Sequence, residues 1–332
     1  MPCPTPIFTA NRLFERTIYS GGVGNPILDE SNVPYATAYN LDFPKVLRAM
    51  EAPTLSFTSP SLLRAADFMT DPYNLPWGTY YLYFANHKGG HIRMAYADDL
   101  QGPWTIYNDG NAVLRLSDNL DYMQRHVASP NVHWDPVAQQ FVMYFHSELP
   151  LGPDVFEQRT FVATSADGLD FTLYDPDVAI AEDEVLGENY FAAFRYVGKP
   201  EGPYFALSTR GPIYESSSPL TGWTPGPAVF ADIADFRHFG VRVVGDCLWV
   251  FYSIKEAIPE QILVKTIDLT LPFADWPASF DASTREDVLI PTYPYELDDG
   301  VLDPFVYAEG GRFSLLYSTD NEAGIAIAEL LT

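Results

Sequence analysis

The chain has 332 residues, 47% of them hydrophobic and 15% aromatic, which is enough for two average domains or one large all-β domain. Its 44 acidic and 19 basic residues give a net charge of −25, so the surface repels nucleic-acid phosphates and anionic lipids and argues against binding to either. The 28 prolines and 22 glycines are spread along the whole length and favour many short strands joined by turns over long helices.

The amino-terminal segment shows no targeting signal. Residues 1–8 lack a basic stretch and a long apolar stretch, so we do not expect a signal peptide, and no run approaches the ~18 apolar residues of a membrane helix. A soluble, cytoplasmic protein is the expectation. Nothing suggests a disulfide framework, since Cys3 lies in a proline-rich start and Cys247 in an apolar run that is typical of a buried strand.

Apolar stretches come in pairs that predict five β-hairpins. In chain order, the pairs are residues 80–85 with 91–96, 140–146 with 160–164, 194–197 with 204–208, 248–253 with 262–267, and 313–318 with 324–328. These stretches mix polar–apolar alternation with continuous apolar runs, as expected for sheets that pack on both faces.

A polar turn closed by an aromatic residue returns after these pairs. The closing residues are Trp104, Phe171, Trp223 and Trp276, at spacings of 67, 52 and 53 residues. That period suits a four-stranded propeller blade with long loops. A pair of β-sandwiches would explain the turns but not the regular return of the aromatic residue. The sequence therefore predicts an all-β fold, a five-bladed β-propeller, as a single domain over residues 1–332.

Two segments lie outside the hairpins. The fifth repeat stops at residue 332 without an outer strand, and an open sheet edge there invites aggregation. We expect residues 13–19 to supply the missing strand and close the ring. A helical turn is expected around residues 60–69, before the first hairpin.

Four segments carry a family resemblance: YYLYFANHKGGHIRMAYADDLQGPW (80–104), HVASPNVHWDPVAQQFVMYFHS (126–147), FRHFGV (236–241) and LDPFVYAEGGRFSLLYS (302–318). They resemble the five-bladed glycoside hydrolases of family 43 and its neighbours in families 32, 117 and 130. The resemblance covers most of the chain in its blade pattern. It implies a propeller of the sugar-enzyme type and leaves the individual activity open.

In family 43, the innermost strand of each blade begins with a short motif that points a polar residue into the axial pocket. The first three blades supply a general-base Asp, an auxiliary Asp and a general-acid Glu. The corresponding segments here are Ser59-Pro60-Ser61, Ala128-Ser129-Pro130-Asn131, Gly187-Glu188-Asn189-Tyr190, Phe236-Arg237-His238 and Leu302-Asp303-Pro304. Serines stand where the family has its two aspartates, which puts the standard mechanism in doubt.

Glycosidic cleavage normally uses two carboxyl groups, one protonated and one ionised. The hypothesis is that Asp303 acts as the base and Glu188 as the acid, and Asp67 could replace either. Family 117 enzymes are proposed to use a histidine as the acid, which makes His238 an alternative to Glu188. Asp303 could equally well belong to an Asp-Pro turn that caps a strand. Glu188 could equally well lie in a solvated loop.

Further residues are predicted to line the same pocket and bind substrate. They are Arg64, Asp67, His87, Lys88, His126, Ser129, His146, Tyr190 and Arg237. The histidines suit proton transfer or hydrogen bonds to sugar hydroxyls, whereas the basic residues would indicate a substrate that bears a carboxylate or sulfate. Their spacing is not that of a zinc motif, so no metal or other cofactor is expected to be required.

Three functions remain open at this point. The first is a glycoside hydrolase-like enzyme acting on a small or unusual carbohydrate. The second is a lyase, dehydratase or cyclase of a small metabolite on the same scaffold, which the missing aspartates favour. The third is a propeller that binds carbohydrate without catalysis. The fold by itself does not choose between them.

Overall fold

The computed structural model describes a large part of the chain. The described residues are 3–12, 28–29, 58–64, 78–85, 89–152, 155–174, 191–199, 203–209, 212–229, 233, 236–254, 257, 259–279, 286–297, 300–319 and 324–331. None of the helices in these segments is long and apolar enough to cross a membrane.

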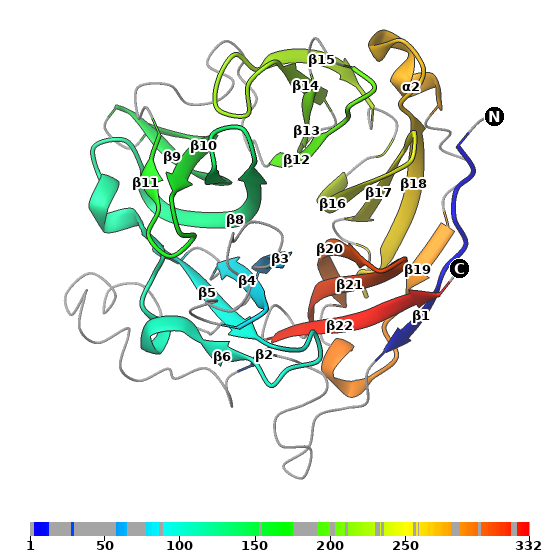
Figure 1. Ribbon diagram of the computed structural model, residues 1–332, viewed down its shortest axis with the longest axis horizontal. Coiled ribbons are helices and arrows are strands. Elements are labelled where there is room, and N and C mark those ends of the chain that lie inside the picture. The colour runs from blue at the N-terminus through cyan, green and yellow to red at the C-terminus, as the bar shows by residue number, and fades with distance from the viewer. Residues whose placement is uncertain are drawn as a thin grey trace.

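Five antiparallel sheets stand around a central axis, as Figure 1 shows. Blade one contains, from the axis outward, β3 (Thr58–Arg64), β4 (Tyr80–Ala85), β5 (His91–Ala97) and β6 (Thr105–Ile106), with β7 (Leu114–Arg115) also on β5. Blade two contains β8 (Gln124–Asp135), β9 (Gln140–Gly152), β10 (Val155–Ser165) and β11 (Thr172–Leu173). Blade three contains β12 (Phe191–Arg195), β13 (Tyr204–Ser208), β14 (Pro212–Ser216) and β15 (Thr224–Ala228).

The last two blades complete the ring. Blade four contains β16 (Phe236–Val244), β17 (Cys247–Ile254), β18 (Ile262–Asp268) and β19 (Glu286–Leu289). Blade five contains β20 (Val301–Glu309), β21 (Arg312–Thr319), β22 (Gly324–Leu331) and, as its outer strand, β1 (Thr9–Arg12), with β2 (Leu28–Asp29) also on β22. The predicted five-bladed propeller is confirmed.

The repeated aromatic residue has a constant place in the blades. Trp104, Phe171 and Trp223 lie in the turn between the third and fourth strands of blades one, two and three, and Trp276 lies in the same connection of blade four. In four blades the predicted hairpin is the second and third strand. In blade three the predicted hairpin is the first and second strands, β12 and β13, so β14 was not predicted.

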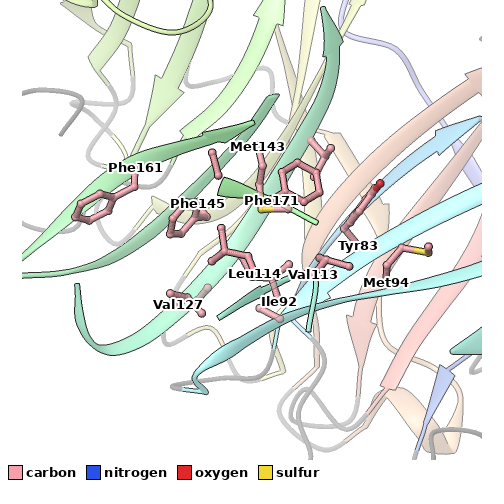
Figure 2. Packing of buried hydrophobic residues seen from close by; sticks show 14 of the residues in the cluster. Tyr83, Ile92, Met94, Val113, Leu114, Val127, Met143, Phe145, Phe161 and Phe171 are labelled. Atoms are coloured by element: carbon pink, nitrogen blue, oxygen red, sulfur yellow. The ribbon is translucent and has the colours of Figure 1, made fainter. Parts of the chain in front are cut away.

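Five clusters of buried side chains fill the five interfaces between neighbouring blades. Figure 2 shows the cluster between blades one and two, where Tyr83 and Met94 of one sheet face Val127, Met143 and Phe161 of the next. Each blade therefore buries both faces, and its strands need apolar residues on both sides. This requirement explains the continuous apolar runs in the sequence.

The amino-terminal strand closes the ring, as expected, but it is an earlier segment than the one expected. β1 pairs antiparallel with β22, from Thr9 opposite Leu331 to Arg12 opposite Ala328, and the two strands lie side by side in Figure 1. Residues 13–19 lie outside the described residues. Pairing along β22 covers what would otherwise be an open sheet edge.

The expected helical turn at residues 60–69 is wrong for its first part. Residues 60–64 belong to β3, the innermost strand of blade one, where Leu62 pairs with Leu82 of β4. Tertiary pairing with the apolar edge of β4 overrides the local helix preference. Residues 65–69 lie outside the described residues.

The sequence suggested no disulfide framework, but Cys3 and Cys247 form a disulfide. Their sequence separation is 244 residues, and the Thr266 hydroxyl donates a hydrogen bond to the Cys3 carbonyl. The disulfide and this hydrogen bond thereby attach the amino-terminal segment to blade four, a few residues before the segment joins blade five as β1. Sequence spacing cannot reveal a single cross-link between elements that only the fold brings together.

Replacing Cys247 by serine is expected to lower the free energy of unfolding by about 2–4 kcal/mol, because the unfolded chain regains the freedom that a long loop closure removes. Urea unfolding of the oxidised protein measures the change. Reduced wild-type protein is the control and should match the variant. Equal stability of oxidised wild type and variant would contradict the prediction.

Candidate functional site

The innermost strands share a local distortion at the same level of the ring. β8, β16 and β20 each carry a β-bulge, and at it Ser129, His238 and Asp303 have φ angles of +55°, +48° and +52°. Residues other than glycine rarely adopt this conformation, and strained backbone clusters at functional sites. β3 is irregular at the corresponding place, between Thr58 and Ser61. Four of the predicted inner motifs therefore coincide with these bulges.

A cavity of about 420 Å³ runs along the axis, and all five innermost strands line it. Ser129 and Asp303 contribute to its wall at the bulge level, and Arg64 lies where β3 ends. The volume falls in the range of small-molecule sites. The axial position follows from the propeller, since the free edge of each sheet faces the centre (Figure 1).

Asp303 is the acid that lines the cavity, and only 3% of its surface is exposed. The Ser318 hydroxyl donates a 3.0 Å hydrogen bond to its Oδ2, and its Oδ1 lies 3.6 Å from the Nδ1 of His238. Blades four and five thus bring together the proposed base and a proposed acid. The serine bond orients the carboxylate and leaves the other oxygen toward the imidazole.

Glu260 completes this group, although its sequence context favours an ordinary loop acid and makes it only a weak candidate for the pocket. Its Oε2 lies 4.0 Å from the Nδ1 of His238 and accepts a 2.8 Å hydrogen bond from the Ser253 hydroxyl. Gly300 packs on the Glu260 backbone, where a Cβ atom would come within 2.3 Å of its carbonyl oxygen. The proline before Glu260 favours an exposed turn, so the sequence offered no signal for its burial.

Two polar residues of the inner motifs connect neighbouring blades. The Ser61 hydroxyl accepts a hydrogen bond from the backbone N–H of Val132, and the Asn131 side-chain oxygen accepts one from that of Ala193. These bonds hold β3 to β8 and β8 to β12 at one level. Ser61 therefore uses its oxygen for architecture, whereas Ser129 lines the cavity.

The histidines of blade two form a second group. His126 and His146 stack edge to face at 5.1 Å, and the Nδ1 of His126 lies 3.9 Å from the Oε1 of Glu148, whose Oε2 forms an ion pair with Arg125. Neither histidine is part of the cavity wall. His126 lies on β8 shortly before Ser129, and His146 lies on β9 opposite Ala128, so the pair is near the proposed site and separate from the Asp303 group.

The remaining predicted residues have different outcomes. Arg64 lines the cavity and forms a 2.9 Å ion pair with Glu309. Arg237 lies in β16 beside His238, and its side chain is outside the described part. The other predicted site residues, which also lie outside the described residues, are Asp67, His87, Lys88, Glu188 and Tyr190.

His133 gives the cavity wall a pH-dependent residue. Its Nε2 faces the Asn131 side-chain oxygen at 2.5 Å, and burial lowers its pKa from 6.5 to about 4. The folded state therefore binds a proton less readily than the unfolded state, so stability is complete above pH 6.5 and declines as the pH falls toward 4.

We expect His133→Gln to remove this decline while keeping a donor for Asn131. Between pH 6.5 and 5 the wild type should lose about 2 kcal/mol more than the variant, at about 1.4 kcal/mol per pH unit. Urea unfolding at several pH values measures this. Parallel stability curves for the two proteins would contradict the prediction.

Comparison with known proteins supports the same fold. No family model matches the chain. An uncharacterized protein of Acanthamoeba polyphaga mimivirus is 27% identical over 286 residues, which is 76% of each chain. An α-L-arabinofuranosidase from Lactobacillus brevis superposes with a TM-score of 0.58 and 14% identity, over 84% of this chain and 92% of that one.

Two further structures match over more of the chain. One structure comes from the GH130 family of mannoside phosphorylases, which contains glycoside hydrolases that target β-1,2-mannosidic linkages in Candida mannan. This structure superposes with a TM-score of 0.63 and 14% identity, over 98% of this chain and 94% of that one. The other, described as a putative glycoside hydrolase of Parabacteroides distasonis, has a TM-score of 0.62 at 14% identity over 96% of both chains. The chain thus has the five-bladed propeller fold of glycoside hydrolase families 43 and 130, as the sequence resemblance indicated.

Proposed function

We propose that the protein is a glycoside hydrolase-like enzyme that acts on a small or unusual, anionic carbohydrate at the Asp303 end of the axial cavity. The observation that carries the proposal is the pairing of Asp303 with His238. Two adjacent inner strands hold these residues in left-handed conformations, with the carboxylate and imidazole 3.6 Å apart. A buried acid next to a titratable base is the arrangement that proton transfer at a glycosidic bond needs.

The chemistry assigns complementary roles to the two groups. Asp303 takes a proton from water, whose oxygen attacks the anomeric carbon, while the glycosidic oxygen leaves with a proton from the acid. Glu188 or His238 is the proposed acid. Glu260 and Asp303 both face the Nδ1 of His238, which favours the tautomer with a proton on that nitrogen and positions the ring. Glu260 is therefore a positioning residue in this scheme.

A second function, a lyase or dehydratase, is favoured by one observation. Ser61 and Ser129 occupy the inner motifs where family 43 has aspartates, and the Ser61 hydroxyl already binds the Val132 N–H. A site with fewer carboxylates suits proton abstraction and elimination as well as hydrolysis.

The test is a panel of aryl glycosides and charged oligosaccharides, with products measured by mass spectrometry. Hydrolysis adds the mass of one water across the two products, whereas elimination leaves a double bond and adds none. Hydrolytic products that disappear with Asp303→Asn are expected. Elimination products would favour the second function, and ligand binding without any product would indicate a non-catalytic propeller.

A further inference from the structure

The axial cavity has a second, basic end. Arg64 is the last residue of β3, Arg195 is the last of β12, and Arg242 lies two residues before the end of β16. All three line the cavity. Arg242 lies four positions after His238 on the same strand, so about 13 Å of strand separates them at ~3.3 Å per residue.

Two of these arginines have partners within the protein. Arg64 pairs with Glu309, whose carboxylate also accepts hydrogen bonds from the hydroxyls of Tyr80 and Tyr307. Arg195 lies over the ring of Tyr204, 5.8 Å from its centroid. Glu309 is thus already engaged by a guanidinium and two phenols, which leaves little capacity for another cation.

Arg242, like Arg195, differs from the arginines of the described part of the chain that form an ion pair with an acid. Arg12, Arg64, Arg125, Arg159 and Arg312 each pair with a glutamate. No hydrogen bond or ion pair joins Arg242 to any residue that the structure describes, although it is partly buried. Burial lowers the pKa of its guanidinium, and the neighbouring Tyr307 partly opposes that shift. In a chain with 44 acidic residues, such a cation is an exception.

We propose that Arg242 is the anion-binding group of the axial cavity and holds the carboxylate or sulfate of a sugar-sized ligand. The five donors of a guanidinium match the oxygens of such a group in a bidentate arrangement. Partial burial strengthens the attraction, since water screens the charge less there than on the surface. Arg195 adds a second positive charge at the same end.

The cavity volume of about 420 Å³ is large enough for a ligand of this size. Binding at Arg242 does not depend on the chemistry at Asp303, since the two residues lie at different levels of the channel. The inference therefore stands or falls separately from the proposed hydrolase activity. If both are correct, the ligand that reaches Arg242 is a negatively charged part of the substrate.

Isothermal titration calorimetry at constant ionic strength tests the inference with three probes. D-glucuronate and glucose 6-sulfate carry the two anionic groups, and D-glucose is the neutral control. Wild-type protein should bind the anionic sugars and not glucose, and whichever of the two binds more tightly identifies the preferred group. Arg242→Met should weaken that binding about ten- to hundredfold, the usual effect of losing hydrogen bonds to a charged group.

Three further variants make the result decisive. Arg312→Met removes the same charge from a side chain that is 81% exposed, and should bind like wild type. Arg242→Lys keeps the charge, and should retain more binding than Arg242→Met. Asp303→Asn should bind the anionic sugars even though it is inactive. Equal binding by wild type and Arg242→Met, or equal losses in Arg242→Met and Arg312→Met, would overturn the proposal.

Discussion

Asp303→Asn is expected to lower kcat/KM by about 10²–10⁴-fold on the substrate that the glycoside panel identifies, because the amide cannot accept the proton that the carboxylate takes. Asparagine has the same shape and tolerates the left-handed conformation that residue 303 adopts, at φ +52°. It can also accept the hydrogen bond from Ser318. The melting temperature should therefore change little. Steady-state kinetics and thermal unfolding measure the two quantities.

The matched control is Asp118→Asn, which makes the same change in the exposed turn between β7 and β8 and should leave kcat/KM unchanged. Full activity of Asp303→Asn would remove this residue from the mechanism. A large fall in melting temperature with the loss of activity would instead assign Asp303 a structural role.

Glu296→Ala is expected to destabilise the protein by about 3–5 kcal/mol, because it leaves a cation in the interior without its partner. Glu296 is fully buried, and one of its oxygens lies 2.7 Å from both the Arg12 Nε and the Tyr317 hydroxyl. The other oxygen accepts hydrogen bonds from the backbone N–H groups of Thr292 and Tyr293. Burial and the charge of Glu296 together raise the pKa of Tyr317 well above its usual value.

This network joins β1 to the body of blade five, so its loss should loosen the closure of the ring. Urea unfolding measures the change. Glu329→Ala is the control, since its ion pair with Arg312 is 3.9 Å long and lies at the surface. That variant should lose at most about 1 kcal/mol. The double variant Arg12→Met/Glu296→Leu should recover part of the stability because it buries no charge. Equal effects of Glu296→Ala and Glu329→Ala would contradict the prediction.

The pattern of the sequence predicted the fold because each blade repeats a local rule. Paired apolar strands and the aromatic residues at 104, 171, 223 and 276 mark the repeat without any knowledge of contacts. The errors lie where a contact between distant segments decides. β3 replaces the first part of the expected helical turn because it pairs with β4, and β1, a segment earlier than the one expected, pairs with β22.

The candidate site divides in the same way. The inner motifs pointed to Ser129, His238 and Asp303, and the β-bulges lie there because a local kink turns each strand at the axis. Sequence alone favoured an ordinary loop acid at Glu260, since its burial depends on the Gly300 backbone and the Ser253 hydroxyl.

Sequence alone thus determined what recurs locally: most of the strands, the turns between them and the number of blades. Tertiary structure alone decided the Cys3–Cys247 disulfide, the group of Asp303, His238 and Glu260, and the position of Arg242 in the cavity. The physical reason is that the periodicity of apolar residues along the sequence records which face of a strand is buried. Ion pairs and cavities depend instead on residues that are distant in the sequence, which only the closure of the ring brings within a few ångströms of each other.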